Sequence, residues 1–461
     1  MAAQQQRRRN DMTLIAFLQA QNCSNLPGSW RHPAAVPDFL TAEHYMRIAR
    51  TLEEGKFHLA FFDDRLAMPD IYGDDHRPAV EWGVRSVKMD VIPLMTAMGL
   101  ATRHLGIGGT CSTTYYEPFH VARAFMTLDH MLGGRAAWNV VTSLNDSEAR
   151  NMGRTEHPAH DERYDRADEF IECVLGHWQS WEDDALVVDQ RTGGLFAHPD
   201  KVHRLDYRGR WFASRGPFTV PRSPQGHPVV IQAGQSGRGK RFAARWGELV
   251  FAAYKTLAIA KAQYRELKDA VAGAGRDPGS VRIAPPVYAI VGETRAAAAE
   301  RRAFIEGLAQ PEDALCLLGE ILNFDFSRHG LDDPLSDADM ASITGQHALR
   351  DRIVQASGTP NPTPRQFIEL SQRGTINEHP VFCGTPADVA DEMESWYQGE
   401  GCDGFVLAAT HRPGAYEDFS RLVVPELQRR GVFQTEYRGT TLRENLGLPR
   451  AVAKGPPSMR I

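Results

Sequence analysis

Short, uninterrupted apolar runs alternate with longer segments of helical periodicity along most of the chain. Runs of this kind are typical of strands buried on both faces, as in a parallel sheet covered by helices. Eight such runs, most of them followed by a helix, predict an α/β fold of the (β/α)8 type, the TIM barrel. The predicted strands are 13–18, 58–62, 105–110, 137–142, 228–233, 249–253, 281–291 and 404–408.

Helical spacing of apolar residues fills most of the gaps between these runs. One start is especially clear, because Thr385 can cap a helix whose first position is Pro386. The predicted helices are 41–55, 117–132, 161–178, 240–246, 257–274, 294–308, 386–400 and 416–430.

Two segments break this alternation, and we expect them to be insertions in one barrel domain that spans 13–461. Residues 183–226 are loop-rich, with Gly, Pro, Asp and aromatic residues, whereas residues 308–382 are polar and irregular. Roughly 250 residues suffice for a bare barrel, so the surplus is expected here. Residues 1–12 form a predicted disordered leader with three consecutive arginines, and either Met1 or Met12 can be the start of translation.

Composition narrows the functional class. Apolar residues make up 42% and charged residues 24% of the 461, as in an ordinary globular protein. The net charge of −6 argues against a nucleic-acid partner, and no apolar run is long enough to cross a membrane. The six cysteines are scattered without a CxxC, and the histidines show no HExxH. We therefore expect a cytoplasmic protein without a metal site.

Polar residues follow the predicted strands where a barrel carries its functional side chains. Asp63 and Asp64 come directly after the second run, Thr110 ends the third, and Asn139 lies inside the fourth. Polar groups at the ends of buried strands need hydrogen-bond partners. A polar ligand in the mouth of the barrel could supply these partners, and so could local capping of loops and helices.

The segment 234–240, with the sequence GQSGRGK, joins a predicted strand to a predicted helix. A glycine-rich turn at the start of a helix directs backbone N–H groups and the helix dipole at an anion, and Ser236 adds a hydroxyl. A P-loop would need Ser or Thr where Arg241 stands, and a nucleophile elbow would need Gly where Arg238 stands. The pattern indicates a phosphate site without a metal ion, whose backbone donors include Gly234 and Gly237.

His160 and Tyr164 stand four residues apart at the start of a predicted helix, where they would share a face if the helix includes both. Both side chains could donate a hydrogen bond to a phosphate group. A local cap at Asp161 together with a core-facing Tyr164 would explain the same pattern.

Three phenylalanines, Phe17, Phe61 and Phe251, fall on predicted strands. Most such residues belong to a core, but they could also form an apolar wall over a flat ligand.

Several long stretches are similar to those of the bacterial luciferase-like flavin monooxygenases. Within them the chain resembles the group of the nitrilotriacetate monooxygenases, pristinamycin synthases and dibenzothiophene sulfone monooxygenases, and residues 180–189 look most like the sulfone branch. The matching stretches are SWRHP (29–33), FFDD (61–64), TCSTTYYEPFHVAR (110–123), 128–153, HDERYDRADEF (160–170), 221–246 and 423–448.

The resemblance implies a barrel that binds reduced FMN supplied by a separate NAD(P)H:flavin reductase. Such an enzyme uses O2 to place one oxygen atom on an organic substrate by way of a flavin peroxide, of the C4a or the N5 form, and assembles as a homodimer or homotetramer. In this sequence the implied FMN contacts are Asp64, Thr110, His160, Tyr164 and Ser236, with Asn139 beside the flavin. The amides of Gly234 and Gly237, already assigned to a phosphate, suit that of FMN. The resemblance also places the oxygen pocket at Thr110 and Asn139 and the substrate contacts at Phe17, Phe61 and Phe251.

The chain also departs from the family pattern. Asn25 and Gln310 stand where the sulfone branch has histidines near its substrate, and Asp63 stands where a small residue or proline is usual. Neither Asn nor Gln can act as an imidazole acid or base. The expected substrate is therefore a flat aromatic or heteroaromatic compound, sulfone-like or otherwise, with halogenated examples included.

Two alternatives remain open at this point. A non-redox, phosphate-binding barrel enzyme would need a strand-end base or Schiff-base lysine, but Lys240 and Lys255 lie beyond the strand ends. A non-catalytic flavin-binding relative would lack the oxygen pocket, against which Thr110 and Asn139 argue.

Overall fold

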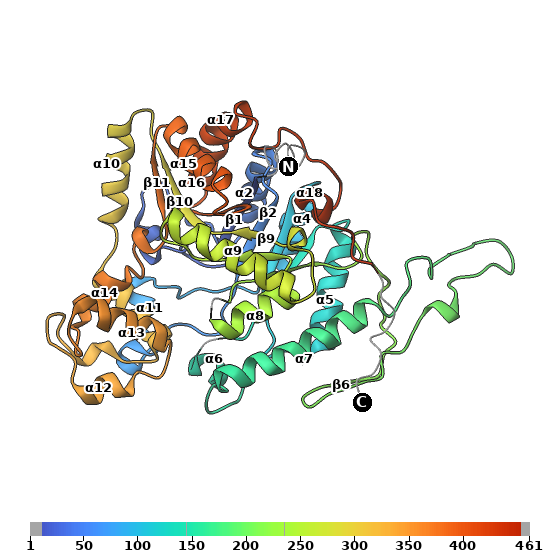
Figure 1. Cartoon of the computed structure of the whole chain (residues 1–461), viewed down its shortest axis with the longest axis horizontal. Helices are drawn as coiled ribbons and strands as arrows, with labels where there is room; N and C mark the ends of the chain where they lie inside the picture. Colours follow the sequence, from blue (N-terminus) through green and yellow to red (C-terminus); the bar gives the residue numbers. More distant parts are fainter. Residues whose placement is uncertain (1–11, 144, 235, 453–461) are drawn as a thin grey trace.

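A closed ring of parallel strands forms the centre of the molecule (Figure 1). The computed structural model describes residues 12–143, 145–234 and 236–452. Strands β9 and β10 occupy one position of the ring, because β9 pairs with β8 while β10 pairs with β12. The ring consists of β1 (Thr13–Gln19), β2 (Leu59–Asp63), β3 (Gly106–Ser112), β4 (Ala136–Val141), β7 (Val229–Gln232), β8 (Leu249–Phe251), β9 (Arg282–Ala284), β10 (Pro286–Val291) and β12 (Gly404–Ala408).

Two faces of the ring are buried, which explains the uninterrupted apolar runs. Inward side chains such as Ile15, Leu59 and Ile231 form a core inside the barrel. Outward side chains such as Leu14 and Phe62 pack with the surrounding helices into the main core. The prediction of a (β/α)8 barrel is therefore confirmed.

The helices that cover the ring begin where the sequence indicates. For example, the Thr385 hydroxyl accepts a hydrogen bond from the N–H of Asp388 (3.3 Å), and the Asp388 carboxylate accepts one from the N–H of Thr385 (3.0 Å). The helices of the described residues are α2 (Ala42–Glu54), α3 (Arg77–Trp82), α4 (Val91–Leu100), α5 (Pro118–Met131), α6 (Asp146–Asn151), α7 (His160–Trp178), α8 (Gly237–Trp246), α9 (Leu257–Gly273), α10 (Arg295–Glu306), α11 (Pro311–Leu322), α12 (Asp337–Ser342), α13 (His347–Ser357), α14 (Pro364–Ser371), α15 (Pro386–Gln398), α16 (Gly414–Asp418), α17 (Val424–Arg429) and α18 (Leu442–Leu446).

The structure corrects three details of the predicted elements. The run 281–291 is two strands, because Pro285 separates them. Strand β11 (Val381–Gly384) pairs with the outer half of β10, where the sequence predicts no strand. The segment 308–382 is not irregular: it contains α11 to α14, whose apolar side chains include Leu318, Phe326 and Phe367 and form a core of their own.

The other predicted insertion, 183–226, projects from the barrel (Figure 1). It contains a short antiparallel pair, β5 (Tyr207–Arg208) and β6 (Ala213–Ser214), and Phe196 is 69% exposed. The predicted leader, 1–12, lies outside the described residues except for Met12, which is buried in the main core and so belongs with the barrel. No described helix has the length and apolarity needed to span a membrane.

The amino end of the barrel is closed by the segment around α18. Leu442, Leu446 and Leu448 join the core inside the barrel. Arg443 holds this segment in place through two hydrogen bonds to the Glu248 carboxylate (2.7 and 2.8 Å). Burial raises the pKa of Glu248, but Arg443 outweighs burial and lowers that pKa to about 2. The pair is therefore ionised at neutral pH.

Replacing Glu248 with glutamine should lower the free energy of unfolding by about 3 kcal/mol, because it leaves the Arg443 guanidinium buried opposite a neutral amide. Since the pKa of Glu248 falls from 4.5 to about 2 on folding, this stabilisation is complete above pH 4.5 and is lost as the pH drops towards 2. Urea unfolding at several pH values measures both effects.

The matched control is Glu266→Gln, which removes an exposed pair with Lys240 (2.9 Å) and should cost less than about 1 kcal/mol. Equal losses in the two variants at neutral pH would contradict the role assigned to Glu248.

Candidate active site at the carboxyl end of the barrel

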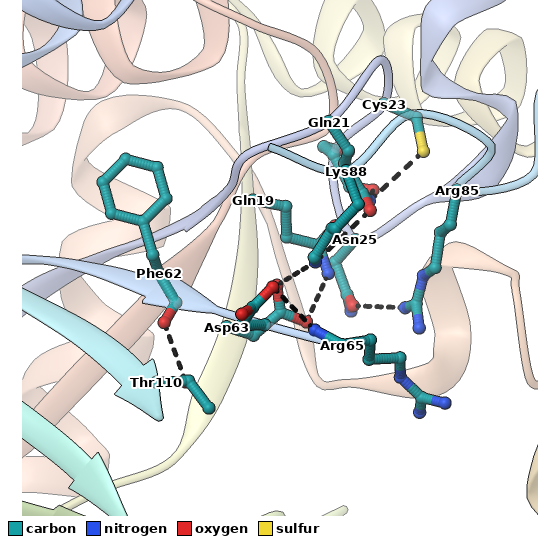
Figure 2. A network of polar contacts seen from close by, with 12 residues as sticks. Gln19, Gln21, Cys23, Asn25, Phe62, Asp63, Arg65, Arg85, Lys88 and Thr110 are labelled. Atoms are coloured by element: carbon teal, nitrogen blue, oxygen red, sulfur yellow. Dashed lines mark hydrogen bonds and ion pairs between the residues drawn. The ribbon is translucent and has the colours of Figure 1, made fainter. Parts of the chain in front are cut away.

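Thr110 and Asn139 lie side by side on β3 and β4, where the two strands pair in register. The Asn139 amide donates to the Thr110 hydroxyl (2.8 Å), which in turn donates to the carbonyl of Phe62 (2.9 Å) (Figure 2 shows the second bond). The other amide atom, Asn139 Oδ1, is buried and has no hydrogen-bond partner among the described residues. Thr110 therefore fixes the amide so that its acceptor is left for a ligand N–H or O–H group.

Ser236, His160 and Tyr164 meet where α7 and α8 begin. The Ser236 hydroxyl caps α8 by accepting from the N–H of Gly239 (3.0 Å), and it lies 3.3 Å from His160 Nε2. Because α7 includes His160, this residue and Tyr164 share a face, with ring centroids 5.1 Å apart. The structure thus brings together all three side chains that the sequence assigns to a phosphate group.

The glycines of this turn allow a close approach of side chain and backbone. A Cβ atom on Gly234 or Gly239 would lie 2.6 or 2.8 Å from the Tyr164 hydroxyl, so neither position has room for a side chain. A Cβ atom on Gly237 would have nothing nearer than 3.9 Å. The space directly beside Gly237, in the first turn of α8, is therefore open. Gln235 lies outside the described residues.

The three predicted substrate contacts form one aromatic shelf inside the barrel. The rings of Phe17 and Phe61 are stacked with centroids 5.7 Å apart, and Phe61 meets Phe251 edge to face at 4.7 Å. Their strands, β1, β2 and β8, place all three near the carboxyl end of the ring. A flat apolar ligand can lie against such a surface.

Asp63 takes part in a buried polar network that the sequence does not reveal (Figure 2). Its carboxylate accepts hydrogen bonds from Gln19 (2.8 Å) and Lys88 (3.0 Å), and Gln21 donates to Gln19 (2.6 Å). Burial raises the pKa of Asp63, but Lys88 and then Arg85 outweigh it, so the net shift is downward. Asp63 therefore remains a carboxylate. Although it departs from the family pattern, it holds Gln19 and Lys88 in place at the carboxyl end of the barrel.

Asp64, the next residue, has the opposite electrostatics. Its carboxylate accepts from the N–H of Arg65 (2.8 Å), and Lys88 only partly offsets the effect of burial. The pKa of Asp64 is raised to about 7. Near neutral pH this predicted FMN contact can therefore serve as a hydrogen-bond donor as well as an acceptor.

The two positions where the sulfone branch has histidines differ in their surroundings. Gln310 is exposed and occupies the N-cap of α11. Asn25 is buried and lies 3.2 Å from the Tyr288 hydroxyl, from His379 Nε2 and from an Arg85 nitrogen. An imidazole is therefore present beside Asn25, supplied by a residue 354 positions away that sequence reasoning did not single out.

Apart from Asp64, which within the described part of the chain bonds only to the N–H of Arg65, the predicted site residues form three groups: the Thr110–Asn139 pair, the Ser236 turn and the aromatic shelf. Among the described residues no hydrogen bond or ring contact joins one group to another. All three lie at the ends or starts of elements that surround the carboxyl end of the ring, so a ligand would have to bridge them.

Comparison with known proteins gives consistent results. The model of the family described as luciferase-like monooxygenase matches residues 16–404. The chain is 44% identical to the dibenzothiophene-sulfone monooxygenase of Rhodococcus erythropolis over 97% of this chain and 99% of that protein. It is 39% identical to nitrilotriacetate monooxygenase component A of Aminobacter aminovorans over 92% and 94%.

Among solved structures, a riboflavin lyase determined with modified FMN and riboflavin superposes with a TM-score of 0.84. The two chains are 29% identical, and the match covers 95% of this chain and 96% of the lyase.

Replacing Thr110 with valine should lower the free energy of unfolding by about 1–3 kcal/mol, because it leaves the buried Asn139 amide without its acceptor. Serine at the same position keeps the hydroxyl and should cost less. Urea unfolding measures the difference.

Thr113→Val is the matched control. The Thr113 hydroxyl donates to the Val141 carbonyl (3.1 Å), but that carbonyl also accepts from the Thr113 N–H (2.9 Å) and keeps a partner. If T113V were as destabilising as T110V, the Thr110–Asn139 bond would not stabilise the folded protein beyond what any buried hydroxyl does.

Proposed function

Because this chain belongs to the luciferase-like monooxygenase family, we propose that it is a two-component, FMNH2-dependent monooxygenase acting on a flat aromatic or heteroaromatic substrate. The main support is the placement of a phosphate-type turn, an unpartnered amide oxygen and an aromatic shelf around one end of the same barrel. The nitrilotriacetate relative is itself named a component of its monooxygenase, which fits a separate NAD(P)H:flavin reductase as the partner.

The residues present fit FMN. Ser236, Tyr164 and His160, together with the N–H groups of the α8 turn, would hold its phosphate at the positive end of the helix dipole. The buried Asn139 Oδ1 would accept from the polar edge of the flavin. Reduced FMN, when bound, supplies the two electrons with which O2 is activated for transfer of one oxygen atom.

The protein's own residues bind, orient and exclude water. Thr110 holds the Asn139 amide in one orientation and so acts as a positioning residue. Phe17, Phe61 and Phe251 keep the inner side of the mouth apolar, which favours a flat substrate and a dry reaction site. Asp64 can hold a proton near neutral pH, since its pKa is raised to about 7.

Anaerobic titration with FMN and FMNH2 tests this proposal. The chain should bind reduced FMN and should oxygenate a flat aromatic substrate when O2 is admitted, with no turnover unless a reductase or a chemical reductant is present. Failure to bind reduced FMN would overturn the proposal and favour a non-redox barrel enzyme. Binding without oxygenation across a panel of sulfones, haloaromatics and N-heterocycles would favour a flavin-binding relative without catalysis.

Replacing Ser236 with alanine should weaken FMN binding by about 1–2 kcal/mol, roughly fivefold to thirtyfold, because a hydroxyl donor to the phosphate is lost. It should also lower stability, because Ser236 caps α8. Fluorescence titration of FMN measures the first effect and urea unfolding the second. Ser336→Ala removes the cap of α12 far along the chain and should change stability without changing FMN affinity. Unchanged FMN affinity in S236A would remove Ser236 from the site.

A further inference from the structure

Arg85 is a buried cation that makes no direct ion pair with any described residue. It lies between α3 and α4, only 6% exposed, and its backbone has a φ of 50°. One guanidinium nitrogen donates to Asn25 Oδ1 (3.2 Å; Figure 2), whereas the buried Nε has no hydrogen-bond partner in the part of the chain that the structure describes. No carboxylate of the described residues lies within ion-pair distance of it.

The neighbouring cations are each compensated. Lys88 pairs with Asp63 (3.0 Å), Arg65 with Glu320 (3.4 Å) and Arg373 with Glu378. Arg412, also buried, lacks a carboxylate but donates to the backbone carbonyls of Gln19, Gln21 and Cys23. Arg85 therefore differs from the cations around it: it acts on Asp63 and Glu378 only through space, and it leaves a buried N–H group that a ligand could satisfy.

A second unpartnered donor lies on the other side of Asn25. Since a guanidinium can only donate, Asn25 Oδ1 faces Arg85 and the amide nitrogen faces Tyr288 and His379 (both 3.2 Å). His379 Nε2 must then accept, and burial lowers the pKa of this imidazole to about 4, so it is neutral and carries its proton on Nδ1. His379 Nδ1 is buried and has no partner among the described residues.

These donors adjoin the aromatic shelf. Tyr288, which accepts from Asn25, belongs to a cluster of buried apolar residues against which Phe17 also packs. Phe17 in turn stacks on Phe61. The shelf is therefore continuous with a group of hydrogen-bond donors that includes the positive charge of Arg85. The acceptors of this group, on Asn25, Tyr288 and His379, already have donors.

We propose that the substrate of this enzyme is an aromatic acid, whose ring lies on the shelf of Phe17, Phe61 and Phe251 and whose carboxylate or sulfonate is bound by Arg85 with His379. An oxyanion accepts two hydrogen bonds in a plane from a guanidinium, so Arg85 is the specificity-determining residue. This inference rests on the proposed monooxygenase function, because it names the substrate class of that site.

Calorimetric titration of the flavin-free full chain tests the proposal. The probes are benzoate, naphthoate and naphthalenesulfonate, each paired with its neutral amide or sulfonamide of the same shape. At least one acid should bind about tenfold or more tightly than its neutral partner, as expected for a charge-assisted bond. No preference for the acid in any pair would overturn the proposal.

Three variants separate binding from structure. Arg85→Met should abolish the preference for the acid while leaving binding of the neutral partner unchanged. Arg85→Lys, which keeps the charge but not the planar fork, should retain only part of the preference and remains informative if R85M does not fold. Arg328→Met, at an exposed arginine, should behave as the wild type. An undiminished preference in R85K or R85M would overturn the proposal.

Thermal unfolding provides a readout that a merely structural role would not give. The acid should raise the unfolding temperature of the wild type and leave that of R85M unchanged, because it binds only a folded chain that carries Arg85. A less stable R85M that still gains stability from the acid would contradict the proposal. Because these measurements need no flavin, loss of the acid preference and loss of FMN binding are distinguishable failures.

Discussion

Closure of the strand ring at Pro285 is the constraint on which the mouth of the barrel depends. On one side of this residue β9 pairs with β8, and on the other β10 pairs with β12. The Pro285 carbonyl accepts from the N–H of Val406 (2.9 Å), so the proline that lacks a donor still takes part in the ladder. Because the ring closes here, Tyr288 on β10 belongs to the cluster against which Phe17 of β1 packs, so the polar and aromatic parts of the mouth become neighbours.

The ring and two parts of the site could be predicted from local sequence. Uninterrupted apolar runs indicate strands buried on both faces, and the turn 234–240 carries its glycines and serine within seven consecutive residues. The four residues of β11, which end in Gly384, are too few to show a pattern. The segment 308–382 looked irregular because its helices bury their apolar residues against one another, so no single one of them has a long apolar run.

The buried polar groups could not be predicted, because their partners are far apart in the chain. Asn25 and His379 are separated by 354 positions, and Gln19 and Asp63 by 44. One signal was present: Gln19 continues the inward alternation of Ile15 and Phe17, and Asp63 continues that of Leu59 and Phe61. Asp63 and Asp64 are adjacent in sequence, but they lie in different surroundings. The pKa of Asp63 is lowered by Lys88 and Arg85, whereas that of Asp64 is raised by burial.

The segment around α18 has a consequence for the way the chain is made. Its leucines fill the amino end of the barrel, and β12 supplies the last pairing partner of β1. During synthesis on a ribosome, which proceeds from the amino end, the apolar interior of the ring therefore stays uncovered until nearly the whole polypeptide has emerged. The nascent barrel depends for most of its synthesis time on chaperones or on its outer helices to keep those side chains from aggregating.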